Sequence, residues 1–269
     1  MKKILKIVIM SGLLLLMITA LFTSCKVSNT NKTLIVGMEL AYPPFETKDT
    51  NGNPSGISTD LAKDLAKYLG EPVKIENIAW TGLIPSLQTG KVDAVISSMT
   101  ITDERKKTVD FSDPYAHSYL ALLVNKKSVV TTSADLNKKG IVVDVKIGTT
   151  ANTYAEKNLT NATVNVLASE NACVTEVVQG KADVFIYDQL TIYRQNQSNL
   201  DSTKAIMIPI QDKENWGIAV KKGNSELLNK INSFIAKYKS DGGFEKLTQK
   251  YLPQEKKIFD SLGFPWFFD

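Results

Sequence analysis

Short apolar runs alternate with amphipathic segments along the first half of the chain. Apolar residues at 61, 65 and 69, with alanines at 62 and 66, share one face of a helix expected over 60–69, which Gly70 and Pro72 end. A shorter helix is expected over 83–89, before Gly90. The apolar runs predict strands at 34–37, 73–75 and 92–96.

The same rhythm returns in the second half. Strands are expected at 141–143, 164–166 and 182–186, and helices from about Thr150 and around 175–179. Strand–helix–strand order at this spacing is typical of a parallel α/β sheet. Two continuous apolar segments fall outside these repeats and are predicted to cross between two lobes: 120–124 and 216–220. Helices over 225–239 and 242–250 are expected to pack on the first lobe.

The predicted fold is therefore α/β with two lobes, each a mostly parallel sheet flanked by helices, joined by two crossing strands. Lobe 1 is expected to comprise residues 33–118 together with 218–269, and lobe 2, including the hinge strands, residues 119–217. A chain of this length can form two lobes with separate cores. In such sheets ligands bind at the carboxyl ends of the strands.

The N-terminus has the pattern of a secretion signal. Residues 1–6 carry three lysines, and residues 7–22 contain no charge, a run that is short for a membrane span. The small residues before Cys25 resemble the lipobox of lipoproteins, with Phe22 as a departure. We expect a lipoprotein signal peptide at 1–24 and a tether at 25–32. An ordinary signal peptide or a short uncleaved anchor are the alternatives.

Charge and cysteine content narrow the choice of partners. Removing residues 1–24 takes away three lysines and no acid, so the formal charge falls from +4 to +1. Nucleic acid is therefore not an expected partner. Cys173 is the other cysteine, so no internal disulfide is expected, and its apolar neighbours indicate a packed small side chain. No metal cluster or catalytic cysteine–histidine pair is expected.

Arg105 is the first candidate for binding chemistry. It lies in the first turn of a predicted short helix, where a cation opposes the helix dipole. A guanidinium there could grip a carboxylate bidentately, with Ser98 and Thr100 as further donors. The alternative is a surface arginine paired with Asp103 or Glu104.

Five further candidates lie at or after the ends of predicted strands. Thr149 and Thr150 stand at a helix start, whose free N–H groups favour an anion or serve as a plain cap. Asp188 ends a strand and could bind an ammonium group or cap the next helix. Tyr42 and Trp80 could enclose a ligand side chain or belong to ordinary packing.

Ordered motifs across nearly the whole mature chain resemble one family. These are 34–37 to 41–46, 56–61, 80–87, 90–94, 99–105, 111–115 and 148–150. Together they are similar to the family 3 extracellular solute-binding proteins of ABC transporters, the polar amino-acid-binding proteins with the type II periplasmic-binding-protein fold. The resemblance implies that Arg105 clamps an α-carboxylate, helped by Thr100 and Thr150. It also implies that Ser98, mainly through its carbonyl, and Asp188 meet the α-ammonium group.

The resemblance assigns the remaining pocket positions as well. Tyr42 and Trp80 match aromatic walls, and Glu39 matches a position that reads the ligand side chain. An acid there favours a cationic or hydrogen-bonding side chain, whereas Ala151 replaces a polar residue of some basic-amino-acid binders. The expected ligand-binding residues are Glu39, Tyr42, Trp80, Ser97, Ser98, Thr100, Arg105, Thr149, Thr150 and Asp188.

The resemblance implies a substrate-binding lipoprotein of an amino-acid importer, without catalytic residues or cofactors. Its expected partners are a free polar amino acid (glutamine, histidine, arginine or cystine), an ABC permease and the cell membrane. The protein is expected to be a monomer, extracytoplasmic and anchored through a lipid on Cys25. Two alternatives are a cyclohexadienyl-dehydratase-like enzyme, for which Glu39 would be the acid, and a stand-alone chemosensory binding protein.

Overall fold

The structure is a computed structural model that describes residues 32–268, and the chain from Thr33 onward forms one compact unit. The predicted signal peptide (1–24), Cys25 and all of the tether except Lys32 lie outside the described residues. Within 32–268, none of the helices combines the length and the apolar character needed to cross a membrane.

The first sheet contains five strands in the order β4-β1-β5-β14-β6. They are β1 (Leu34–Met38), β4 (Val73–Asn77), β5 (Ala94–Val95), β6 (Val109–Phe111) and β14 (Ala219–Lys221). β1 pairs in parallel with β4 and β5, whereas β14 runs antiparallel to β5 and β6. The associated helices are α2 (Ile57–Leu69), α3 (Leu83–Thr89), α8 (Ser225–Ser240), α9 (Gly243–Tyr251) and α10 (Pro253–Leu262).

The second sheet repeats this arrangement in the order β10-β9-β11-β8-β12. Its strands are β8 (Leu120–Asn125), β9 (Val142–Lys146), β10 (Thr163–Leu167), β11 (Val184–Asp188) and β12 (Thr203–Ile206). β9 is parallel to β10 and β11, and β8 is antiparallel to β11 and β12. Its helices are α5 (Thr150–Asn158), α6 (Glu170–Gln179) and α7 (Gln189–Ser198). The α/β prediction is confirmed, with mixed rather than mostly parallel sheets.

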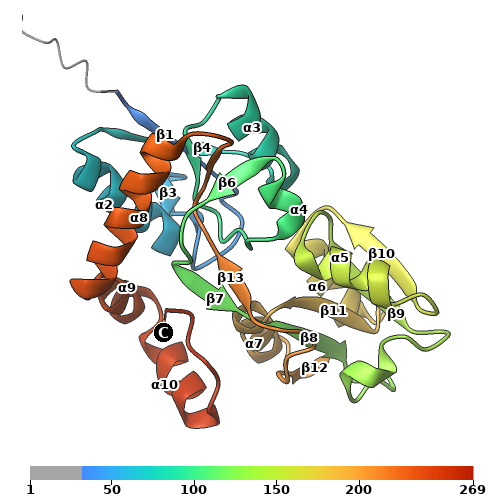
Figure 1. The fold of residues 1–269 in the computed structure, drawn as a ribbon. Helices are drawn as coiled ribbons and strands as arrows, with labels where there is room; N and C mark the ends of the chain where they lie inside the picture. Colours follow the sequence, from blue (N-terminus) through green and yellow to red (C-terminus); the bar gives the residue numbers. More distant parts are fainter. Residues whose placement is uncertain (1–31, 269) are drawn as a thin grey trace, which may run out of the picture. The chain divides into compact units, whose positions relative to one another are not determined.

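The chain passes between the sheets through a separate antiparallel pair, β7 (Ala116–Ser118) and β13 (Glu214–Trp216). β7 leads from β6 into β8, and β13 leads from β12 into β14, so both connections run through this pair (Figure 1). The predicted crossing segments 120–124 and 216–220 do not pair with each other, because they lie mainly in β8 and β14; only Trp216, at the end of β13, belongs to the crossing pair. All six residues of β8 are buried because the strand lies inside the second sheet, between β11 and β12.

Shorter elements occupy the loops. A small hairpin joins β2 (Thr47–Lys48) and β3 (Pro54–Ser55), and short helices cover Trp80–Gly82 (η2), Asp103–Lys106 (α4) and Ser133–Asp135 (η3). The loops that hold η2 and α4 follow β4 and β5 of the first sheet, and α5 and α7 follow β9 and β11 of the second. This order brings the candidate residues to the carboxyl ends of the parallel strands.

Separate hydrophobic clusters support the two sheets. A cluster of Leu61, Leu65, Ile231 and Phe234 packs α2 and α8 against the first sheet. Cys173 is a free, fully buried cysteine in a cluster that packs α6 against the second sheet. Burial raises the pKa of its thiol to about 12, and the nearby Asp144 carboxyl adds to the increase. Cys173 thus acts as a small packed side chain, as predicted.

Candidate functional site

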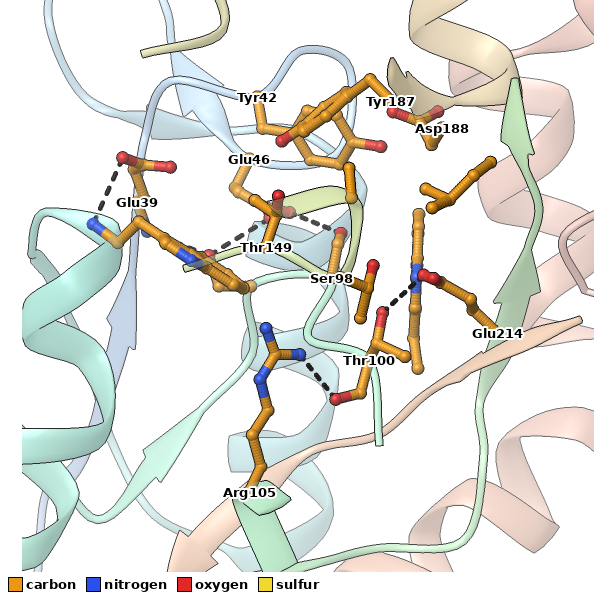
Figure 2. A pocket seen from close by; sticks show the side chains of 16 residues that line it. Glu39, Tyr42, Glu46, Ser98, Thr100, Arg105, Thr149, Tyr187, Asp188 and Glu214 are labelled. Atoms are coloured by element: carbon orange, nitrogen blue, oxygen red, sulfur yellow. Dashed lines mark hydrogen bonds between the residues drawn. The ribbon is translucent and has the colours of Figure 1, made fainter. Parts of the chain in front are cut away.

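One pocket gathers the predicted binding residues from both sheets (Figure 2). All ten lie in its lining: Glu39, Tyr42, Trp80, Ser97, Ser98, Thr100, Arg105, Thr149, Thr150 and Asp188. Six residues outside the expected set complete the lining: Glu46, Leu120, Ala151, Tyr187, Glu214 and Trp216. Of these, the family resemblance matches Ala151 to a pocket position. Four of these sixteen side chains carry a carboxyl group, and Arg105 supplies a positive charge. The lining therefore suits a small molecule that carries at least one cationic group.

Arg105 faces this pocket from α4, the short helix that follows β5. Thr102 caps α4 by accepting a hydrogen bond from the Arg105 main-chain N–H at 3.2 Å. The guanidinium donates to the carbonyl oxygens of Thr100 at 2.7 Å and Gly148 at 3.0 Å. Within the described residues these are its hydrogen-bond acceptors, so further N–H groups can serve a ligand. Burial lowers the pKa of Arg105 to about 10.

The alternative of a surface ion pair for Arg105 does not match the structure. Asp103 lies 3.8 Å from the Lys106 amine, and Glu104 accepts a hydrogen bond from Lys107. Instead, the guanidinium carbon lies 5.2 Å from the centre of the Trp80 ring. Arg105 is thus held by main-chain carbonyls and an aromatic face, an arrangement that leaves its charge uncompensated by its neighbours on α4.

Asp188 approaches the pocket from the end of β11. Its Oδ1 accepts hydrogen bonds from the main-chain N–H groups of Leu190 and Thr191, both at 3.0 Å, and so caps α7. Its Oδ2 is buried and has no hydrogen-bond partner in the described part of the chain. Burial raises the pKa of Asp188. The side chain is therefore a helix cap and also has an oxygen without a partner, and such an oxygen favours a cationic ligand group.

Ser97 and Ser98 surround a buried acid that sequence reasoning missed. Glu46 is 1% exposed and accepts hydrogen bonds from the hydroxyls of Ser58 at 2.6 Å, Ser97 at 3.2 Å and Ser98 at 3.2 Å. Burial raises the pKa of Glu46 to about 8, although the three hydroxyls oppose this shift. Ser98 has a φ of 49°. Such a left-handed conformation is strained for serine and is typical of functional sites.

Thr100 connects the pocket to the crossing strands. Its hydroxyl donates to Glu214 Oε2 at 2.9 Å, and its main chain forms an isolated bridge with Trp216. Burial raises the pKa of Glu214, while nearby Thr150, Thr100 and Arg105 lower it. Glu214 was also missed, because its sequence neighbours are polar and suggest an exposed turn.

Aromatic side chains form the walls. Tyr42 lies edge-on to Tyr187, with ring centres 5.8 Å apart, and to Trp216 at 6.3 Å. Trp80 begins η2 and lies against the turn at Gly148, where a β-carbon would come within 3.3 Å of the indole nitrogen. Gly148 has a φ of 70°, so both its conformation and this close approach favour glycine.

The side chains of Thr149 and Glu39 both interact with other groups of the protein. Thr149 caps α5: its hydroxyl accepts from Asn152 N at 3.2 Å and donates to the Lys146 carbonyl at 2.8 Å. Glu39 Oε1 accepts a hydrogen bond from the Trp80 main-chain N–H at 3.2 Å, and Glu39 Oε2 forms an ion pair with Lys146. Lys146, which is 3% exposed, is a third charged residue that sequence reasoning missed.

The described residues contain no group of three or more His, Cys, Asp or Glu side chains placed to hold a metal ion. The pocket instead presents a guanidinium and a buried carboxylate oxygen from two different sheets. Such an arrangement defines a binding site for a small molecule that carries both charges.

Comparison with known proteins agrees with this class of site. Residues 34–254 match the model of the bacterial extracellular solute-binding proteins, family 3, and the chain belongs to this family. It is 33% identical over 222 residues to the L-cystine-binding protein TcyJ of Escherichia coli, covering 82% of each chain. It is 34% identical to the L-arginine-binding protein of Pseudomonas aeruginosa, over 82% of this chain and 88% of that protein.

Solved structures agree with the fold. The crystal structure of the ancestral amino-acid-binding protein AncCDT-1, a precursor of cyclohexadienyl dehydratase, aligns with a TM-score of 0.75 and 39% identity, over 81% of this chain and 94% of that one. The two curated relatives are binding proteins, as is the matched family. The chain is accordingly a binding protein and not an enzyme.

Proposed function

We propose that this chain is the extracytoplasmic substrate-binding component of an ABC importer and that it binds a free polar amino acid in the pocket. One observation carries the proposal: Arg105 and Asp188 present opposite charges to one pocket from different sheets. An amino acid brings a carboxylate and an ammonium group, and each loses water on binding. Each therefore needs a buried partner of opposite charge.

The geometry suggests a role for each partner. The unengaged N–H groups of Arg105 would bind the α-carboxylate, with Thr100 and Thr150 beside it. The free Oδ2 of Asp188 and the carbonyl of Ser98 would accept hydrogen bonds from the α-ammonium group. Tyr42 and Trp80 would enclose the rest of the ligand.

Two lobes would close around the ligand. We assign residues 33–118 with 218–269 to lobe 1 and residues 119–217 to lobe 2. This assignment is supported by the two five-stranded sheets, because each of them draws all its strands from one of these sets. Rotation about β7 and β13 would bring Thr150 and Asp188 toward Arg105, and the permease would recognise the closed form.

The named ligands of relatives suggest the substrate class. Those relatives bind cystine and arginine, and the polar pocket also suits glutamine or histidine. All four share the α-carboxylate and α-ammonium groups that Arg105 and Asp188 would hold. The residues that line the part of the pocket next to the ligand side chain would determine which of these amino acids binds.

A lipid on Cys25 would hold the protein at the outer face of the cell membrane, with residues 25–32 as a tether. In cells, Cys25→Ser should move the protein from the membrane fraction to the soluble extracytoplasmic fraction, with ligand binding unchanged. A wild-type protein that is already found in the soluble fraction would contradict the anchor.

Thermal unfolding tests the binding proposal. The purified protein is unfolded and refolded to remove carried-over ligand, then melted with each amino acid and with prephenate. A ligand at 100 times its dissociation constant adds about 2.7 kcal/mol of stability, a shift of several degrees. Arg105→Ala should abolish the shift, whereas Arg194→Ala, which removes an arginine 3.9 Å from Glu255, should keep it. The absence of a shift with every amino acid would reject the proposal.

A further inference from the structure

The end of the chain contacts both lobes. Residues 255–268, which we call the C-terminal strap, comprise most of α10 and the segment after it, and they lie beyond the residues that match the family. The strap follows α8 and α9, which pack on the first sheet, and it also contacts α7 of lobe 2. It is therefore a third link between the lobes, besides β7 and β13.

Aromatic side chains hold the strap on lobe 1. The indole N–H of Trp266 donates a hydrogen bond to Thr248 Oγ1 on α9 at 3.1 Å. The Phe268 ring stacks on Phe244, also on α9, with ring centres 5.2 Å apart. Trp266 is 3% exposed. Because these contacts are extensive and buried, we expect the strap to move together with lobe 1.

On lobe 2 the strap contacts the first two turns of α7. The Phe259 ring lies edge-on to the Tyr193 ring, with centres 6.0 Å apart. Gln189 Nε2 donates a hydrogen bond to the Pro265 carbonyl at 3.2 Å. None of these four residues lines the pocket. The strap therefore reaches lobe 2 without a contact to the ligand site.

The contact between the strap and α7 depends on how the lobes are oriented. The Arg105 guanidinium of lobe 1 donates to the Gly148 carbonyl of lobe 2 at 3.0 Å, so in this structure the lobes meet across the pocket. A rotation about β7 and β13 that separates Arg105 from Gly148 would also shift α7 against the strap. The contact therefore stabilises the closed arrangement relative to an open one.

We propose that the C-terminal strap biases the two lobes toward the closed arrangement by docking on α7, and so strengthens the binding of every ligand of the pocket. This inference rests on the proposed function, since it concerns closure around the same ligand. A contact that favours only the closed form lowers the dissociation constant by the factor with which it favours closure, when the free protein is mostly open. The factor is the same for all ligands because the strap touches none of them.

Tyr193→Ala tests this role by removing the ring that meets Phe259. Titration calorimetry gives the dissociation constant, and stopped-flow mixing the dissociation rate constant, for each amino acid that binds the refolded wild type. Tyr193→Ala should raise both constants by about fivefold to tenfold, and by the same factor for each ligand. Tyr193→Phe keeps the ring and should behave like the wild type.

Two controls isolate the contact between the lobes. The Tyr68 ring on α2 lies 5.6 Å from the Phe234 ring on α8, so this ring pair belongs to lobe 1 alone, and Tyr68→Ala should leave both constants unchanged. Arg194→Ala should change them by less than about twofold, because its ion pair with Glu255 is partly exposed. If Tyr193→Ala does not fold, Tyr193→Leu replaces it, since leucine keeps apolar volume and lacks the ring.

The outcomes separate this inference from the proposed function. Unchanged constants in Tyr193→Ala, unequal factors for different ligands, or an equal rise in Tyr68→Ala overturn the role of the strap while amino-acid binding stands. Failure of the wild type and of every variant to bind any amino acid overturns the proposed function itself.

Discussion

The main-chain N–H of His117 donates a hydrogen bond to the carbonyl of Phe267 at 2.8 Å. This bond ties the C-terminal segment to the crossing strand β7. Gln189 Nε2 adds a second bond to the Pro265 carbonyl at 3.2 Å, from α7 beside the second sheet. The aromatic C-terminus therefore packs on the region where the chain crosses between the sheets.

Phe267→Ala should destabilise the protein strongly. Phe267 is fully buried and contacts Phe45, with ring centres 5.4 Å apart, so its removal leaves a cavity in the core. We expect a loss of about 3–5 kcal/mol in the free energy of unfolding, measured by chemical denaturation. Leu262→Ala, at a position that is 56% exposed, should cost far less. Equal losses for the two variants would contradict this packing role.

The buried acid Glu46 should make stability depend on pH. Its folded pKa of about 8 lies above its ordinary value of 4.5, so between these values the folded state binds more protons than the unfolded state. The free energy of unfolding should therefore fall as pH rises from about 4.5 to 8. The titration of Glu46 should account for a fall in the free energy of unfolding on the order of 5 kcal/mol or less over this pH range.

Glu46→Gln should flatten that pH profile and raise stability at pH 8 relative to the wild type. Glu170 and Asp144, whose pKa values burial raises to about 7 and about 6, retain part of the slope in the same direction. The exposed Glu245 provides the matched control, because Glu245→Gln should keep the wild-type profile. An unchanged profile in Glu46→Gln would rule out this account of Glu46.

Asp188→Asn should separate the capping role of this side chain from its binding role. Asparagine is also a good helix cap, so stability should change by less than about 1 kcal/mol. The ligand ammonium group would lose its buried anionic partner, and affinity should fall about 100-fold. Ser169→Ala is the control, because Ser169 caps α6 with a 3.3 Å bond and does not line the pocket. It should lose about 1 kcal/mol of stability and no affinity.

Most inner strands of both sheets and the helices packed on them were predictable, because their apolar residues follow the periods of buried elements. The edge strands β6 and β12 and the helix α10 were not predicted. Nor was the crossing pair. β7 consists of Ala116, His117 and Ser118, which carry no apolar pattern, whereas the continuous run in β8 reflects burial inside a sheet. A continuous apolar run in the sequence indicates that a segment is buried, but it does not identify which strand pairs with that segment.

The pocket likewise contains residues that the sequence predicts and residues that it does not. Asp188 ends β11, Thr150 begins the helix after β9, and Arg105 lies in the short helix after β5. Their places at the carboxyl ends of strands predict that they meet. Glu46, Lys146 and Glu214 are charged residues whose burial arises from tertiary packing. Nothing in their local sequence distinguishes them from solvated charges, and hydrogen bonds between distant segments hold them in place.

Calorimetric titration of the refolded protein with individual amino acids tests the central claim most directly, when the wild type is compared with Arg105→Ala. For at least one polar amino acid we predict a dissociation constant near the micromolar range, which corresponds to a binding free energy of about 8 kcal/mol in magnitude. Arg105→Ala should weaken binding by about 100-fold or more, because the carboxylate loses its buried partner. Heat-silent titrations with every amino acid, or unchanged affinity in Arg105→Ala, would contradict the account.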